Sequence, residues 1–430
     1  LEVIGNNIAN ANTFGAKSSR AEFADFYANA LNGSTASAVG IGTQLATISQ
    51  QFTQGSITST DNPLDIAING RGFFQVSDGS SPTKYSRNGQ FKVDRDGYIV
   101  NNAGLKLLGY EADPGTGQIQ AGLAVPIHLP TGGIAPAATV KTGMQLNLDS
   151  TKKVTVPASA PLIDFSDATT YNNATSLTVY DAKGDPVALT YYFQRASVND
   201  GTATDDWNVY VTANGQTVLP AGATDNSAPE SIGTITFSAD GSVPTGFTAG
   251  SGVTGTIDAN TNKIDITFPD IQGGADANGL VPLPISGLSL SMDVTQFASP
   301  FGVTDLSQDG FAAGQLSSIG IEANGIITAR YSNGQTKSAG QIETANFRNL
   351  QGLQPIGDNM WAYTFASGDP VTGVPGEGNL GVLQAGALEE SNIDMTAELV
   401  NMITAQRAYQ ANAQTIKTQD QVMQTLVNLR

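Results

Sequence analysis

The chain has 430 residues, and its 20 Lys and Arg against 38 Asp and Glu give a net charge of −18. This length suggests about two to four domains, each with room for a core. An acidic chain lacks the basic surface that nucleic acids require, and no apolar run approaches the roughly 20 residues of a membrane span. We therefore expect neither nucleic-acid binding nor membrane insertion.

Catalytic chemistry finds little support in the composition. The chain has no cysteine and a single histidine, His128, which lies in a short apolar stretch and is interpreted as structural. A multi-histidine metal site, a disulfide and a thiol nucleophile are thereby excluded. Asp205 and Asp206 beside Trp207 form the best candidate pair for glycoside hydrolysis, but adjacent strand residues face opposite sides of a sheet. We expect no enzyme, no catalytic residue, no cofactor and no metal.

The N-terminal residues predict a short helix. Its apolar positions follow the three- and four-residue spacing of one helix face: Leu1, Ile4, Ile8 and Ala11. Gly15 is expected to end this helix as its C′ residue. The sequence starts without a Met, and we expect further residues upstream of Leu1. A helix this short is marginal in water and needs support from other helices, although an ordinary helical core would give the same pattern.

The interior reads as β-structure joined by tight turns. Asp96-Gly97, Asn324-Gly325 and Asn333-Gly334 stand between alternating apolar and polar segments, which predicts hairpins. Asp94 and Asp96 resemble half of a calcium loop, but no acidic ligands follow them, so a turn is favoured. We assign residues 25–52, rich in Gly, Ala, Ser and Thr, to a linker. Residues 53–148 with 301–389 are assigned to a β-rich middle domain.

Residues 149–300 differ from their flanks and predict an inserted β domain. Their strands alternate cleanly, and they contain 5 Lys and Arg against 16 Asp and Glu, which contributes −11 to the net charge. Long stretches of Gly, Ala, Ser, Thr and Asp separate the strands. We interpret the charge as a solvated surface that favours solubility and not as a binding site.

The C-terminal residues 390–430 predict one long helix. They contain neither Pro nor Gly, and residues 391–394 (SNID) supply capping side chains. An apolar stripe interrupted at Gln406 and Asp420 includes Leu399, Met402, Tyr409, Ile416, Met423 and Val427. Such a helix is too long for a small core, so we expect it to pair with the N-terminal helix and with copies in neighbouring subunits. Residues 1–24 with 390–430 are therefore assigned to one helical assembly domain. The predicted fold is thus mainly β with α-helical termini: a coiled-coil-like inner domain and two β-rich outer domains, the outermost inserted in the other.

Several segments resemble the bacterial flagellar rod and hook axial proteins. Residues 5–17 (GNNIANANTFGAK) are similar to the N-terminal signature of that family, and residues 61–74 (DNPLDIAINGRGFF) with 85–91 (YSRNGQF) to its central motif. Residues 392–403 (NIDMTAELVNMI) and 406–412 (QRAYQAN) resemble its terminal helix. The family usually writes Gly-Phe-Lys where this chain has Phe14-Gly15-Ala16-Lys17, a small departure.

Within this group the hook subunits fit best. Residues 332–336 (SNGQT), 345–347 (ANF) and 352–355 (GLQP) resemble the outer β region of hook subunits, whereas rod subunits are shorter. The resemblance covers roughly residues 1–150 and 300–430 and leaves the inserted domain unconstrained.

The resemblance implies a secreted structural protein. It implies export through the flagellar type III apparatus without a cleaved signal peptide, and an extracellular location in the flagellum. Copies are expected to form a curved helical tube that acts as a universal joint and transmits torque from rod to filament. The implied partners are further copies of the chain and the rod, hook-cap and hook–filament junction proteins.

Two other functions remain open on the residues alone. A distal rod subunit would form a straight, rigid shaft, and the length and the large insertion argue against it. A surface-displayed glycan-binding protein or adhesin would use the acidic β domain, and glycan binding by that domain would distinguish it from a joint.

Overall fold

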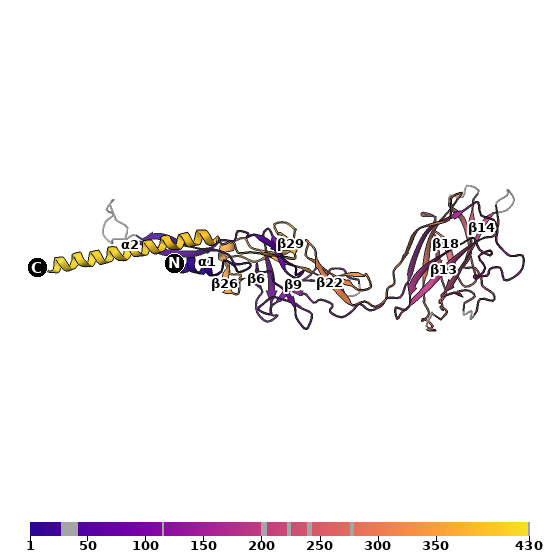
Figure 1. Ribbon diagram of the computed structural model, residues 1–430, viewed down its shortest axis with the longest axis horizontal. Coiled ribbons are helices and arrows are strands. Elements are labelled where there is room, and N and C mark those ends of the chain that lie inside the picture. Colours follow the sequence, from indigo (N-terminus) through magenta and orange to yellow (C-terminus); the bar gives the residue numbers. More distant parts are fainter. Residues whose placement is uncertain are drawn as a thin grey trace. The chain divides into compact units, whose positions relative to one another are not determined.

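The computed structural model describes residues 1–26, 42–113, 116–198, 204–221, 225–238, 243–275 and 279–428. The chain divides into two compact units. Unit 1 comprises Leu1–Gly132, Leu316–Arg330 and Thr336–Arg430, and unit 2 comprises Gly133–Gln315 and Tyr331–Gln335. Both units are rich in β-strands, and helices lie near the two chain ends (Figure 1). The predicted fold class, mainly β with helical termini, is confirmed.

The terminal helices are α1 (Glu2–Ala9) and α2 (Met395–Asn428). They contact each other, and Figure 1 shows α1 beside the N-terminal part of α2. With 34 residues, α2 is about 51 Å long at 1.5 Å per residue. Asp394 caps it, because its Oδ1 accepts hydrogen bonds from the backbone N of Thr396 at 2.9 Å and of Ala397 at 3.1 Å. No helix among the described residues is long and apolar enough to cross a membrane.

The N-terminal helix is shorter than the sequence predicted. It ends at Ala9, with Asn10 as its C-cap, so Ala11 lies in the following turn. Gly15 has a φ of +71°, but it serves this later turn and not the helix end. The expectation that Gly15 is a C′ residue is therefore wrong. The two roles share the left-handed backbone that favours glycine, which is why the sequence does not separate them.

The segment predicted as a linker contains a strand. Strands β1 (Ser19–Phe26) and β2 (Gly42–Gln50) pair in antiparallel fashion, with a bulge between Glu22 and Phe23. The linker prediction for residues 25–52 is thus wrong for β2 and for the last two residues of β1, while residues 27–41 lie outside the described part. Residues 19–24, which were assigned to the helical domain, also form a strand. β2 (GTQLATISQ) is rich in Thr, Gln and Ser and lacks a clean alternation of polar and apolar residues, so its composition resembles a linker although β-branched Thr and Ile favour a strand.

The rest of unit 1 is a β domain with small flanking sheets. Its main sheet has the order β22-β23-β24-β9-β5-β6-β27-β26, while β29 pairs with β4 and β3 with β30. The strands and the 3-10 turn η1 are β3 (Ile57–Ser59), β4 (Ile66–Asn69), β5 (Phe73–Ser77), β6 (Lys84–Ser86), β7 (Lys92–Val93), β8 (Ile99–Val100), β9 (Lys106–Glu111), β10 (Val125–Pro126), β22 (Leu316–Ile321), β23 (Ile326–Tyr331), β24 (Thr336–Ile342), β25 (Thr344–Asn346), η1 (Leu350–Gly352), β26 (Gln354–Gly357), β27 (Met360–Ala362), β28 (Val371–Gly373), β29 (Val382–Ala385) and β30 (Ala387–Glu389).

The predicted hairpin turns are present. Gly97, Gly325 and Gly334 have φ values of +85°, +84° and +82° and stand between β7 and β8, β22 and β23, and β23 and β24. The carboxylate of Asp94 accepts hydrogen bonds from the backbone N of Asp96 and Tyr98 at 3.0 and 2.8 Å. Its oxygen is therefore used within the turn, as the interpretation of this segment as a turn requires.

Unit 2 is a sandwich of two sheets around one core. One sheet has the order β18-β19-β20-β11-β21 and the other β12-β13-β14-β16-β17, with β15 beside β14. Figure 1 labels β13, β14 and β18 in this unit. The strands are β11 (Lys141–Asp149), β12 (Asn173–Tyr180), β13 (Pro186–Arg195), β14 (Asp205–Ala213), β15 (Gln216–Thr217), β16 (Gly233–Phe237), β17 (Pro244–Ala249), β18 (Thr254–Ile257), β19 (Ile264–Thr267), β20 (Ser289–Phe297) and β21 (Gly302–Gln308).

The inserted domain is longer at both ends than the sequence predicted. The sequence placed its start at residue 149, but β11 precedes that residue and pairs in parallel with β20 and in antiparallel fashion with β21. Met144, Leu146 and Leu148 of β11 belong to the same buried core as Trp207. Residues 133–148 and 301–315 therefore belong to unit 2. Alternation identifies a strand but not its sheet, so the sequence could not assign β11.

A core substitution tests the separate packing of the units. Leu290 is fully buried on β20, and Leu290→Ala should lower the free energy of unfolding of unit 2 by about 2–5 kcal/mol. The chain has two tryptophans, Trp207 in unit 2 and Trp361 in unit 1. Urea unfolding followed by Trp207 fluorescence in a Trp361→Phe background measures the effect.

Ser291→Ala on the same strand is the matched control, because Ser291 is only half-buried and alternates with Leu290. It should change the free energy by at most about 0.5 kcal/mol. Equal effects of the two substitutions would contradict the assignment of the buried face of β20.

Candidate functional site: the junction of the chain ends

The candidate assembly residues on α2 are largely exposed. We call Leu399, Met402, Tyr409, Ile416, Met423 and Val427 the α2 stripe; of these Met402 is half-buried and the others are exposed. Tyr409, Met423 and Val427 are 70, 62 and 71% accessible. Burying a large apolar side chain stabilises an association by about 1.5–3 kcal/mol. The stripe is therefore a long apolar surface that packing within one chain leaves available.

The N-terminal candidates are less exposed. Leu1 is exposed, whereas Ile4, Ile8 and Ala11 are half-buried. The structure brings α1 against α2, and the side-chain amide of Asn7 donates a hydrogen bond to Glu398 Oε1 at 3.0 Å. The two ends of the chain thus meet, but α1 is far too short to cover the α2 stripe.

A further apolar surface was missed by the linker prediction. Phe23 and Leu45 are direct cross-strand partners on the β1–β2 hairpin, and both are more than half exposed. Ile48 is also exposed and lies opposite Ala21. Paired side chains on one face of a two-stranded ribbon have no second layer to cover them.

The chain ends are joined to the β domain through a buried charge network. Glu389, the last residue of β30, accepts a hydrogen bond from Lys17 Nζ at 2.6 Å on Oε1 and one from Arg87 at 3.0 Å on Oε2. The backbone N of Gly55 also donates to Glu389 Oε1, at 3.0 Å. The side chains of Lys17 and Glu389 are fully inaccessible, and that of Arg87 is 5% accessible. We call Lys17, Arg87 and Glu389 the charge network.

Burial sets the electrostatics of this network. Burial lowers the pKa of Lys17 below its usual value, and the adjacent Glu389 carboxylate opposes that shift. Burial likewise lowers the pKa of Arg87, again against Glu389. Two basic side chains share one carboxylate, so removing the carboxylate would leave both cations buried without their counter-ion.

Two asparagines complete the junction. Asn7 is 2% accessible; its amide donates to the backbone O of Ser19 at 2.8 Å and its Oδ1 accepts from Ser19 N at 2.9 Å. Asn392 accepts from the backbone N of Ser18 at 2.8 Å and donates to the backbone O of Gln51 at 2.7 Å. Asn7 thus fixes α1 to the start of β1, and Asn392 fixes the segment before α2 to the residues on either side of the β1–β2 pair.

The backbone itself is tightly packed at this point. Gly15 N donates to the backbone O of Glu389 at 2.8 Å, and a Cβ on Gly15 would lie 2.6 Å from Asn88 N. A Cβ on Gly55 would lie 2.0 Å from the backbone O of Glu390. Only glycine lets these backbone segments approach so closely.

The candidates for other chemistry have structural partners. Asp205 forms a bidentate ion pair with Arg195 at 2.8–3.1 Å, and Asp206 accepts hydrogen bonds from Thr204 and Thr236 at 2.6 and 2.8 Å. His128 Nε2 lies 3.0 Å from the backbone O of Asp96. Among the described residues, no cluster of three or more His, Cys, Asp or Glu could hold a metal ion.

The charge network was not predicted from the sequence, although its three residues lie in or next to segments that resemble the family. Lys17 and Arg87 lie inside the motifs of residues 5–17 and 85–91, and Glu389 directly precedes the C-terminal segment. An isolated charge within a motif is a weak signal of burial. The pairing joins residues 372 and 302 positions apart, which no local pattern reveals.

Family models place the chain among the flagellar axial proteins. Residues 1–17 match a flagella basal body rod protein model, residues 67–182 a flagellar hook protein FlgE/F/G D1 domain, residues 147–311 a flagellar basal body protein FlaE D2 domain, and residues 384–429 a flagellar basal body rod FlgEFG protein C-terminal model. The matches thus cover both chain ends and parts of both β-rich units.

Individual relatives identify the family within the flagellar axial proteins. The flagellar hook proteins FlgE of Salmonella typhimurium and Escherichia coli are each 40% identical to this chain, over all of the chain and 96% of the relative, and that of Borreliella burgdorferi is 31% identical over the same shares. The chain therefore belongs to the flagellar hook protein FlgE family, and its function is that of a structural subunit of the bacterial flagellar hook.

A solved structure supports the fold independently. The hook protein FlgE2 of Helicobacter pylori matches with a TM-score of 0.50 and 15% identity, covering 77% of this chain and 99% of the other. At this identity the likeness shows the fold alone.

Removing the shared carboxylate tests the charge network. Glu389→Gln should lower the free energy of unfolding of unit 1 by about 3–5 kcal/mol, because two buried cations lose their counter-ion. Lys17→Met should cost only about 1 kcal/mol, because Arg87 and Glu389 remain as a neutral pair. Urea unfolding followed by Trp361 fluorescence in a Trp207→Phe background measures both.

Glu390→Gln is the matched control for this ordering. Glu390 is adjacent but exposed, so its substitution should change the free energy by at most about 0.5 kcal/mol. If Lys17→Met cost as much as Glu389→Gln, the shared-carboxylate account would be wrong.

Proposed function

We propose that this chain polymerises through its terminal helices into a curved tube, which acts as a universal joint and transmits torque from rod to filament. The observation that carries the proposal is the exposed α2 stripe, anchored by a buried junction to the β domain. An apolar surface of this length on an otherwise ordered helix is stabilised when neighbouring subunits cover it.

The proposed inner contacts are between helices of neighbouring copies. The residues assigned to them are Leu1, Ile4, Ile8 and Ala11 with the α2 stripe. Each copy contributes one surface and receives another, so the interface is heterologous and open and generates a filament instead of a closed ring. The charge network fixes the direction in which both helical segments leave the β domain, so each copy presents them in the same way.

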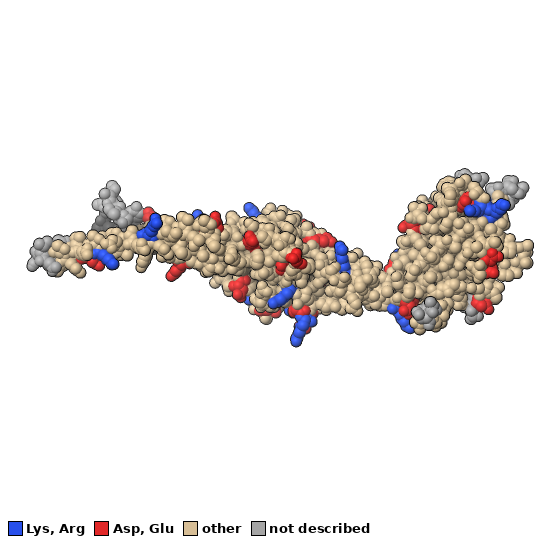
Figure 2. Space-filling model, in the orientation of Figure 1, with Lys and Arg blue, Asp and Glu red and all other residues tan. Residues whose placement is uncertain are grey.

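The proposed outer contacts are polar and slide as the tube bends. In a rotating curved tube each protofilament must shorten and lengthen in turn, so outer contacts need to exchange at little cost. Figure 2 shows that most of the visible surface carries no charge and that charged residues are scattered over it. Such a surface offers few strong ion pairs that would lock neighbouring β domains in one position.

The proposal includes the setting of the assembly. It places the chain outside the cell, in the flagellum, after type III export without a cleaved signal peptide. Its partners are then further copies of the chain and the rod, hook-cap and hook–filament junction proteins. The full-length match to hook proteins supports the hook over the distal rod and over a surface adhesin.

A charge placed in the α2 stripe tests helix-driven assembly. The purified chain should form curved tubes under salting-out conditions, and Ile416→Glu should reduce the sedimentable fraction at least tenfold. The reason is that a carboxylate placed in an apolar interface is buried without a partner. Electron microscopy and sedimentation measure the result.

Thr418→Glu is the matched control, because Thr418 is also exposed on α2 but lies about 200° around the helix from Ile416. It should leave assembly within about twofold of the parent chain. Straight rods from the parent chain would favour the distal rod, and a monomeric parent chain would contradict the proposal.

Excision of the sandwich tests the separation of assembly from bending. Ala137 and Phe311 exchange two backbone hydrogen bonds of 3.0 Å, so residues 138–310 can be replaced by a two-residue Asn-Gly turn. The shortened chain should still form tubes, with altered curvature or stiffness in electron micrographs. Loss of all assembly, with Trp361 fluorescence still native, would show that the sandwich is required for polymerisation.

A further inference from the structure

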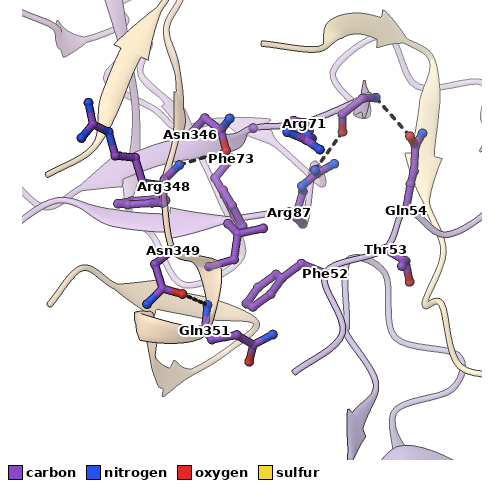
Figure 3. A pocket seen from close by; sticks show the side chains of 14 residues that line it. Phe52, Thr53, Gln54, Arg71, Phe73, Arg87, Asn346, Arg348, Asn349 and Gln351 are labelled. Carbon is purple, nitrogen blue, oxygen red and sulfur yellow. Dashed lines mark hydrogen bonds between the residues drawn. The ribbon is translucent and has the colours of Figure 1, made fainter. Parts of the chain in front are cut away.

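Two adjoining cavities on the β domain of unit 1 form one groove. Their volumes are about 620 and 640 Å³, and they share four lining residues: Arg71, Asn346, Phe347 and Arg348. Arg71 lies in the turn between β4 and β5, and Arg348 follows β25. We call this surface the arginine groove. Figure 3 shows Arg71, Arg87 and Arg348 around the first cavity, with Phe52 and Phe73 among its lining side chains.

The side chains of Arg71 and Arg348 are exposed, and neither has a polar partner within the described residues. Within the described residues, the guanidinium groups of Arg71 and Arg348 make no hydrogen bond and no ion pair, in contrast to those of Arg87 and Arg195. Glu377 is the only acidic side chain among the described residues that line the two cavities, and it pairs with neither arginine. In a chain with 38 acidic and 20 basic residues, two free guanidinium groups in one groove are available for an external partner.

Three neighbouring polar side chains already have hydrogen-bond partners. Gln54 accepts a hydrogen bond from Gly70 N at 3.1 Å, Asn349 donates to the backbone O of Ala366 at 3.0 Å, and Gln351 donates to the backbone O of Gln50 at 2.7 Å. The guanidinium groups of Arg71 and Arg348 are the charged donors that the described lining residues leave unpaired, and a positively charged donor prefers an anion as its ligand.

The charge network adds positive charge beneath the groove. Arg87 lines the first cavity, lies over the ring of Phe73 at 5.4 Å, and has a buried Nε without a hydrogen-bond partner among the described residues. Together with Lys17 it places two basic side chains around the single carboxylate of Glu389. This arrangement favours an anion above the floor of the groove.

The shape of the groove favours a carboxylate on a side chain. Phe73 packs edge-to-face on Phe52 and Phe347, with ring centroids 5.8 and 6.0 Å apart, and forms an apolar floor. Guanidinium groups bind planar carboxylates in a bidentate manner, and the apolar floor suits the methylene groups of Asp or Glu. Two connected cavities have room for several residues of an extended segment.

We propose that the arginine groove binds a carboxylate-bearing segment of a second copy of this chain, with Arg71 and Arg348 as its ion-pair partners. Charge complementarity argues for that occupant, since each copy has a net charge of −18 and residues 149–300 alone contribute −11. Neighbouring copies repel unless local positive surfaces meet their carboxylates. The inference rests on the proposed self-assembly and adds an outer contact to it.

Zero-length crosslinking within the assembled polymer tests this contact. In Arg348→Lys and Arg71→Lys variants, a carbodiimide joins the new amine to a carboxylate only where the two form an ion pair. Polymers built from equal parts of isotopically light and heavy chains should yield light–heavy crosslinked peptides that join position 348 or 71 to an Asp or Glu. These peptides should be absent from the monomer.

Arg330→Lys is the matched control, because Arg330 is exposed but outside the groove, and it should yield at least tenfold fewer mixed crosslinks. A second variant, Arg71→Glu with Arg348→Glu, should reduce the sedimentable fraction at least tenfold under the conditions in which the parent chain polymerises, whereas Glu377→Gln should not. Polymers that form normally but give only same-copy crosslinks or none at these positions would overturn the groove proposal. A parent chain that does not polymerise would instead overturn the proposed function.

Discussion

The carboxylate of Glu389 is shared by two buried cations, and the arrangement of the chain ends depends on this contact. Lys17 comes from the segment after α1, Arg87 from the β domain, and Glu389 from the strand before α2. A buried network of this kind contributes little net stability, because desolvation of the charges offsets their attraction. What it supplies is a defined geometry: Lys17 and Glu389, which lie beside the two helical segments, are both held in a buried cluster with Arg87 of the β domain. In a repeating assembly, that constraint gives every subunit the same helical segments in the same place.

The position of α2 depends on the charge network because most of the helix is not packed against the rest of the chain. Its own apolar stripe is exposed, and α1 covers only its beginning. Asp394 caps its start and Asn392 fixes the preceding turn to the β1–β2 hairpin, so the helix begins at a set position. Beyond that point the described apolar side chains of the helix are largely exposed. In the proposed assembly, neighbouring copies would cover them, which would couple polymerisation to the ordering of the inner part of the subunit.

The sandwich of unit 2, in contrast, is stabilised by a hydrophobic core of its own. Its core joins residues of both sheets and includes Trp207, and its chain enters and leaves through the paired residues Ala137 and Phe311. A unit with its own core and adjacent ends can be inserted, exchanged or lost without disturbing the host domain. The arginine groove belongs to the host domain. Its two arginines, Arg71 and Arg348, are exposed on a chain whose net charge is −18. In the proposed assembly, the apolar helices would supply the affinity between copies, and the local ion pairs would set their register.

The sequence by itself determined the features that depend on local pattern. Glycine-containing turns at Gly97, Gly325 and Gly334, the capped C-terminal helix and the alternating strands of unit 2 were all predicted, because turn conformation, capping and alternation act over a few residues. Four family-like motifs carried the functional assignment. Tertiary structure alone decided which strands share a sheet, which placed β11 in unit 2 and made a strand of a segment that had read as linker. It alone also brought Lys17, Arg87 and Glu389 together, since a charge that is isolated in sequence acquires its partner only when distant segments pack.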